Sequence, residues 1–193
     1  MQVADRIDAV VSETSSGAAA PTESAILAHA QTVEALAASN RTLLPARFGG
    51  GLADEDDLRR RLEGREEQLV AAFDRVDGCA EVGLRVVPAN GAGRDRPQSG
   101  REYMERRLDQ VGRAEALARE LHAELAELAR ESTQRVLARP DVVLTAAYLL
   151  PREQVDAFKA TISAAQGRQP GVVLVCTGPW PPYSFALLDA EGG

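Results

Sequence analysis

Residues 142–177 read VVLTAAYLL, PREQVDAFKATISAAQ, GRQPG and VVLVCT in turn, and this stretch decides the fold. The first run, residues 142–150, is apolar with β-branched and aromatic members, which predicts a strand. The last run, residues 172–177, is continuously apolar and predicts a second strand, buried on both faces if it is central in its sheet. Residues 167–171 contain two glycines and a proline and predict the turn that precedes it.

The segment between these two strands predicts a short helix. Pro151 is suited to open it, and Val155, Phe158 and Ile162 recur at helical spacing, so we expect them to face inward. A strand, a helix and a strand in succession predict a crossover connection within one sheet. We therefore expect a mixed α and β architecture.

A long helix is predicted upstream of this unit, from Arg101 to about Ala138, where Pro140 stops it. One side of it is apolar, with Met104, Leu108, Val111, Ala118, Leu121, Leu125 and Leu128. Its length leaves open a break near Gly112 or a projecting segment.

Two further helices are predicted nearer the N-terminus. Thr22 can cap the first, which runs to about Asn40. Asp54 can cap the second, which continues through Gly64 and ends at Gly78. The glycine inside the second helix costs about 1 kcal/mol relative to alanine.

The alternation of apolar and polar residues at 82–86 predicts a half-buried strand, and residues 8–11 are also prone to form one. Residues 88–99 have no apolar periodicity and predict a linker or a long surface loop. We therefore expect an N-terminal α+β domain at residues 1–87, this linker, and a C-terminal domain at residues 100–193.

The 193-residue chain has a formal net charge of −7 and a sequence pI of about 5.0. Nucleic-acid binding needs a basic surface, and no basic and aromatic stretch is present, so nucleic acid is not an expected partner. The apolar runs fall far short of the ~20 residues of a membrane helix, and the first residues lack the features of a signal peptide. We expect a soluble cytoplasmic protein.

The chain offers few residue types for catalysis. His29 and His122 lie in predicted helices without a second metal ligand three or four residues away. Ser184 lacks the nucleophile-elbow pattern, and no phosphate-binding loop is present. Cys79 and Cys176 stand beside apolar residues, and buried free thiols are favoured over a disulfide. We therefore expect no enzyme, no cofactor and no metal.

The segment Gly178-Pro-Trp-Pro-Pro-Tyr-Ser-Phe185 follows the last strand and is unusually rigid. Its three prolines fix φ, and each also restricts the residue before it. Trp180, Tyr183 and Phe185 are therefore held with little conformational entropy left to lose. This pattern fits a preordered partner anchor, and it also fits a plug for a core with few aromatics, and the two roles can coexist.

A second notable turn is Leu44-Pro-Ala-Arg-Phe-Gly49. We expect Phe48 to pack inside and Arg47 to pair with a carboxylate or a backbone carbonyl. A partner contact at this turn is the alternative.

Four stretches together are similar, in order and spacing, to sequences of the gas vesicle protein F/L (GvpL/GvpF) family, over roughly residues 8–186. They are His29–Leu36 with Leu44–Gly49, Ser99–Tyr103, Ala147–Leu150 with Val155 and Phe158, and Gly178–Phe185. Members usually open with a strand of the Tyr-x-Tyr-Gly type, which is absent here, and Gly50-Gly51 replace a bulkier pair after the first turn.

The resemblance implies a small N-terminal α+β domain that lacks the family's first strand, and a modified ferredoxin-like C-terminal domain with the long helix. It implies a non-enzymatic accessory protein of gas vesicle formation, located in the cytoplasm and at the vesicle. The implied partners are the major shell protein and other accessory vesicle proteins. The alternative is a ferredoxin-like module that senses a small molecule.

The resemblance and the residues together give a set of candidate positions for partner contact or family signature. They are Arg47, Phe48, Tyr103, Tyr148, Trp180, Tyr183 and Phe185.

Overall fold

The computed structural model describes residues 2–4, 7–12, 21–39, 42–88, 99–136, 142, 144–169 and 172–186. Several side chains of the long helix, that of Tyr103 among them, lie outside the described residues. So do most of the expected linker at 88–99 and the expected helix end near Ala138 and Pro140.

The chain divides into two compact units, and each is described by itself. Unit 1 comprises residues 1–77 and 181–193, and unit 2 comprises residues 78–180. The boundary expected at residues 88–99 is therefore not where the chain divides. The reason is that the strand before it pairs on both sides with strands that follow it, so it belongs to the C-terminal sheet.

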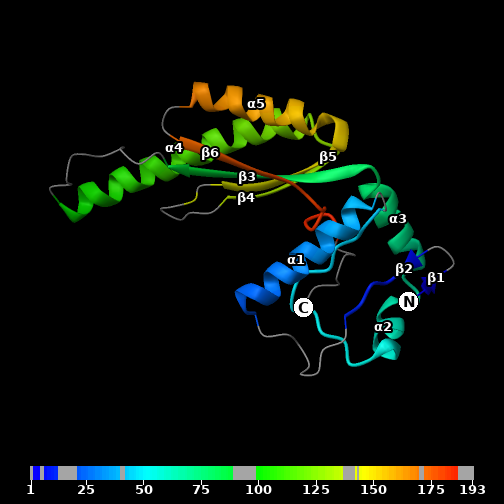
Figure 1. The fold of residues 1–193 in the computed structure, drawn as a ribbon. Coiled ribbons are helices and arrows are strands. Elements are labelled where there is room, and N and C mark those ends of the chain that lie inside the picture. The colour runs from blue at the N-terminus through cyan, green and yellow to red at the C-terminus, as the bar shows by residue number, and fades with distance from the viewer. Residues whose placement is uncertain are drawn as a thin grey trace. The chain divides into compact units, whose positions relative to one another are not determined.

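Unit 2 contains a four-stranded antiparallel sheet in the order β4-β5-β3-β6 (Figure 1). The strands are β3 (Cys79–Pro88), β4 (Glu131–Val136), β5 (Leu144–Pro151) and β6 (Val172–Trp180). Both β5 and β6 run antiparallel to β3, so they run parallel to each other with β3 between them. The expected crossover joins them, through a 3₁₀ turn (Arg152–Gln154) and α5 (Val155–Arg168).

Helices α4 (Gly100–Ala126) and α5 cover one face of this sheet (Figure 1). The core lies between the helices and the sheet. Helix α5 contributes Val155, Phe158 and Ile162 to it, as expected. Its other members come from β3, β5, β6 and α4 and include Val82, Leu84, Val86, Leu121, Leu125, Leu144, Tyr148, Leu150 and Val172.

The long helix ends at Ala126, earlier than expected, and a fourth strand that was not expected follows it. The amides of Leu128 and Ala129 donate to the carbonyls of Leu125 and Ala126, which closes the last turn. The Arg130 amide then donates to the Leu149 carbonyl at 2.8 Å and begins the pairing with β5. Pairing with β5 therefore overrides the helical pattern of the sequence here.

Strand β6 is not central in the sheet, so it is not buried on both faces. It is an edge strand, and its exposure alternates from Val172, which is buried, to Val173 and Val175, which are 43% and 41% exposed. The inner strands are β5 and β3, and in β3 the residues Val82, Leu84 and Val86 on the helix-covered face are buried.

Unit 1 contains α1 (Glu23–Ala38), α2 (Glu55–Leu62), α3 (Glu66–Val76) and a two-stranded sheet of β1 (Gln2–Ala4) and β2 (Ile7–Asp8). Thr22 and Asp54 cap α1 and α2 as expected. The single helix expected from Asp54 to Gly78 is two helices, because Gly64 adopts φ +72° and ends the first. No helix in the described ranges is long and apolar enough to cross a membrane.

Candidate functional site

The end of β6 is built around Gly178, in unit 2. This glycine has φ +102°, and its peptide bond to Pro179 is cis. A Cβ atom placed on it would lie 2.7 Å from the backbone oxygen of Glu81, so only glycine fits. Lys159 of α5 donates from Nζ to the Gly178 carbonyl at 2.6 Å. The backbone just before Trp180 is therefore restrained by the close approach of β3 and by the hydrogen bond from Lys159.

Trp180 is the last residue of β6, and its side chain is 45% exposed. Its register partner is Glu81 of β3, beyond an irregularity in the pairing of these strands. An exposed indole on restricted backbone is a suitable protein-binding anchor, because little entropy is lost when a partner covers it.

Residues 181–185 belong to unit 1 and form a compact turn. The amide of Tyr183 donates to the Pro181 carbonyl at 2.8 Å, and that of Phe185 donates to the Pro182 carbonyl at 3.1 Å. Both prolines are buried, and Phe185 is only 3% exposed. In α3, Arg75 donates to the Phe185 carbonyl at 2.6 Å. Phe185 is therefore a buried residue of unit 1, tied to α3 through its backbone carbonyl.

Tyr183 is half-buried in the same unit. Burial, and secondarily the carboxylate of Glu34 in α1, raise the pKa of its phenol. The neutral hydroxyl is the form present at physiological pH, and it can donate or accept a hydrogen bond.

The turn after α1 places Arg47 and Phe48 in different surroundings. Phe48 is half-buried and meets the ring of His29 edge-on, with 5.7 Å between the centroids. His29 also bonds the Ala46 carbonyl through Nε2 at 3.0 Å. Arg47 is exposed, and the described contacts give it no ion pair. Phe48 thus packs against His29 without entering the buried core, and no pairing of Arg47 is found among the described residues.

Tyr148 lies at the centre of the unit 2 core and is fully buried. Its hydroxyl bonds His122 Nδ1 at 3.2 Å, and its ring lies 5.0 Å from that of Phe158. Burial raises the pKa of Tyr148 well above its ordinary value and lowers that of His122. Tyr148 therefore has a structural role and cannot touch a partner in the folded state.

The candidate positions thus separate by exposure. Tyr148 and Phe185 are buried, Phe48 and Tyr183 are half-buried, and Arg47 and Trp180 are open to a partner. The side chain of Tyr103 lies outside the described residues.

Groups that could carry chemistry are dispersed. In the described ranges, no three His, Cys, Asp or Glu side chains are placed to hold a metal ion. Both cysteines are free, with Cys79 buried and Cys176 half-buried. Burial raises the pKa of the Cys176 thiol, although Lys159 nearby acts in the opposite direction. The protonated thiol is a weak nucleophile.

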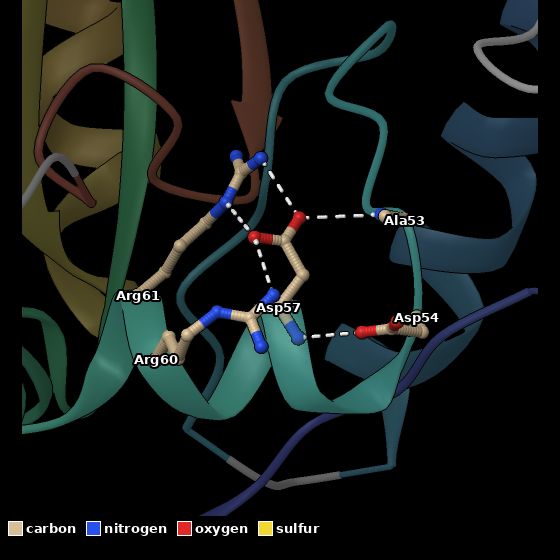
Figure 2. A network of polar contacts seen from close by, with 5 residues as sticks. All are labelled: Ala53, Asp54, Asp57, Arg60 and Arg61. Carbon is tan, nitrogen blue, oxygen red and sulfur yellow. Dashed lines mark hydrogen bonds and ion pairs between the residues drawn. The ribbon is translucent and has the colours of Figure 1, made fainter.

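A polar network lies at the N-terminus of α2, in unit 1 (Figure 2). Asp57 accepts from Arg61 at 2.9 Å and from the Ala53 amide at 3.2 Å, and its own amide donates to Asp54 at 2.7 Å. The hydrogen bond from Arg61, followed by that from Ala53, lowers the pKa of Asp57. This network caps a helix and is structural.

Comparison with solved structures defines the class of protein. The crystal structure of gas vesicle protein GvpF from Anabaena sp. PCC7120 is 21% identical, with a TM-score of 0.74 over 91% of this chain and 80% of that one. The GvpF structure from Microcystis aeruginosa is 18% identical, with a TM-score of 0.71 over 88% of this chain and 81% of that one. The chain therefore has the α+β fold of these gas vesicle proteins.

Sequence comparison identifies the family to which the chain belongs. The profile of the family described as gas vesicle synthesis protein GvpL/GvpF matches residues 1–187, and the chain belongs to this family. Gas vesicle protein L of Streptomyces sp. (strain CB03234) is 36% identical, and the match covers 77% of this chain. The matched region is 64% of the length of that relative, so this chain corresponds to less than two thirds of it.

Proposed function

We propose that this chain is a non-enzymatic accessory protein of gas vesicle formation. It binds the major shell protein and other accessory vesicle proteins, and so helps to nucleate or assemble the gas-filled shell in the cytoplasm. The observation that carries this proposal is the family match over residues 1–187.

The placement of the signature residues supports binding rather than catalysis. Trp180 is exposed on a backbone restricted at Gly178 and bonded by Lys159, whereas Tyr148 and Phe185 are buried. The signature thus combines structural aromatics with one exposed anchor. In this proposal Trp180 contacts a vesicle protein.

Co-expression of the tagged chain with the major shell protein, and with each accessory vesicle protein of the same organism, tests the proposal. At least one of them should co-purify with the tagged chain. If none associates, even when all are expressed together, the adaptor function is wrong.

Two alanine variants separate anchoring from folding. Trp180→Ala should keep the melting temperature within a few degrees, because the indole is 45% exposed, and should weaken binding. Phe185→Ala removes a buried ring and should destabilise the fold by about 3–5 kcal/mol. A soluble Trp180→Ala protein that binds as tightly as the parent would remove Trp180 from the contact surface.

A further inference from the structure

The sheet of unit 2 has a second face, opposite α4 and α5. Successive residues of a strand point to opposite faces. Val82, Leu84 and Val86 of β3 pack in the core under the helices, so Gly83, Arg85 and Val87 belong to the second face. Their register partners in β5 and β6 share that face.

The second face is covered at one end and open at the other. Leu149 and Glu81, which are register partners, are 0% and 9% exposed. Further along the strands, Thr145, Arg85 and Arg135 are exposed, as are Val173 and Val175. The open part is therefore confined to the end of the sheet near Val87.

A cross-strand row runs through this open part. Arg135 of β4 pairs with Thr145 of β5, Thr145 pairs with Arg85 of β3, and Arg85 pairs with Val175 of β6. Two arginines thus stand two strands apart, at roughly 10 Å, with a short threonine between them. In the next row, Val87 pairs with Val173 and extends the apolar side.

The arginines of this row are not neutralised by the described part of the chain. Neither Arg85 nor Arg135 has an ion pair or a side-chain hydrogen bond to a described residue, whereas Arg59, Arg61, Arg101 and Arg168 each pair with a carboxylate. This is a local basic and apolar surface on a chain whose net charge is −7. Its complement is a partner that combines apolar side chains with carboxylates.

The charge also argues against a second copy of this chain on the same face. A twofold interface apposes one patch to itself, so it would bring the arginines of both copies together. Like charges facing each other across an interface cost several kcal/mol. The occupant is therefore a different chain.

The dimensions fit a single helix. Four strands span about 15 Å, and the open part extends about four residues, or roughly 13 Å, along them. A helix with its side chains is about 10–12 Å across.

We propose that the open part of this face, centred on the Arg135–Thr145–Arg85–Val175 row, docks an amphipathic helix of a partner vesicle protein. The apolar stripe of that helix covers Val173 and Val175, and carboxylates beside the stripe pair with Arg85 and Arg135. This inference rests on the proposed function, because it names the surface and the chemistry through which a vesicle protein is bound.

The test is a charge reversal with a matched control. The double variant Arg85→Glu, Arg135→Glu is compared with Arg101→Glu, Arg152→Glu, which changes the net charge equally at exposed positions of the same unit away from this face. Because all four side chains are exposed, the variants should melt close to the parent. Binding is measured with the purified full chain against the major shell protein and each accessory vesicle protein of the same organism.

The first variant should bind at least about tenfold more weakly, and the control should bind like the parent. Binding by the parent should also weaken as salt is raised. A partner in which the carboxylate residues beside the apolar stripe are replaced by arginine should bind the Arg85→Glu, Arg135→Glu variant again. It should not bind the parent or the control more tightly.

Two outcomes overturn the inference in distinguishable ways. If the parent binds a vesicle protein and the Arg85→Glu, Arg135→Glu variant binds it equally well, the surface is wrong and the proposed function stands. If the parent binds none of the vesicle proteins, the proposed function fails and this inference fails with it.

Discussion

Gly178 shows how one residue type is imposed by its surroundings. Its φ of +102° is unfavourable for other residues, and a Cβ atom would meet the Glu81 carbonyl of the neighbouring strand. The sequence identified this segment by its prolines and aromatics. It could not reveal the close approach of β3, because that depends on strand pairing between residues far apart in the chain.

Gly178→Ala should therefore be destabilising. We expect a loss of about 1–3 kcal/mol from the positive φ alone, with more from the clash, measured by urea unfolding. Gly112→Ala is the matched control, since it lies in α4 with no atom within 4 Å of its added methyl group. It should be neutral or stabilising by up to about 1 kcal/mol. Equal stability of the two variants would contradict this account of Gly178.

His122 predicts a pH dependence of stability. Burial lowers its pKa below the ordinary value of 6.5, so the unfolded chain binds the proton more tightly than the folded one. The stability associated with the neutral ring is complete above pH 6.5 and declines as the pH falls below it.

Urea unfolding at pH 7.5 and pH 5.5 measures this effect in the parent and in His122→Gln. The glutamine variant keeps a polar group beside the Tyr148 hydroxyl but cannot titrate. The parent should lose more stability between these pH values than the variant does. An identical loss in both proteins would show that His122 does not contribute.

Among the elements, β6 was expected from its apolar run, but its place at the edge of the sheet was not. Edge strands expose unpaired backbone groups that invite association with other chains. Here the side chain of Gln166 in α5 accepts from the Leu174 amide at 2.7 Å and donates to the Val172 carbonyl at 2.9 Å. One amide side chain therefore replaces part of a missing neighbouring strand.

Gln166→Ala should remove this protection. We expect the Leu174 amide to exchange hydrogen faster, while amides paired between β3 and β5 are unchanged, together with a loss of about 1–3 kcal/mol. Light scattering should show more aggregation on heating. Ser163→Ala, which removes an exposed hydroxyl from the same helix, is the control. Unchanged exchange at Leu174 would rule out the role given to Gln166.

The strength of local signals explains which elements could be predicted. The Thr22 and Asp54 caps, the β5 run and the inward face of α5 follow from side chains close together in sequence. Strand β4 is polar and follows a helix without a glycine or proline, so only its pairing with β5 defines it. The Arg85 and Arg135 row likewise exists only through strand register.

For the whole molecule, the division of the chain at residues 77 and 181 has a testable consequence. Unit 2 contains its own sheet, helices and buried core within one continuous segment. The fragment of residues 78–180 should therefore fold alone and melt cooperatively. Circular dichroism and calorimetry measure this.

The control fragment is residues 88–193, which follows the boundary that the sequence suggested. It lacks β3, the inner strand that pairs with both β5 and β6, and should not melt cooperatively. A folded 88–193 fragment, or an unfolded 78–180 fragment, would contradict the division.

The same division bears on synthesis at the ribosome. The Phe185 carbonyl accepts a hydrogen bond from Arg75, and Phe185 is synthesised only after the whole of unit 2. The first 77 residues therefore emerge from the ribosome before Phe185 is made. During the synthesis of unit 2, α3 lacks the hydrogen bond between Arg75 and Phe185. A product truncated before residue 181 would therefore contain the whole of unit 2 but lack the contact between Phe185 and α3 of unit 1.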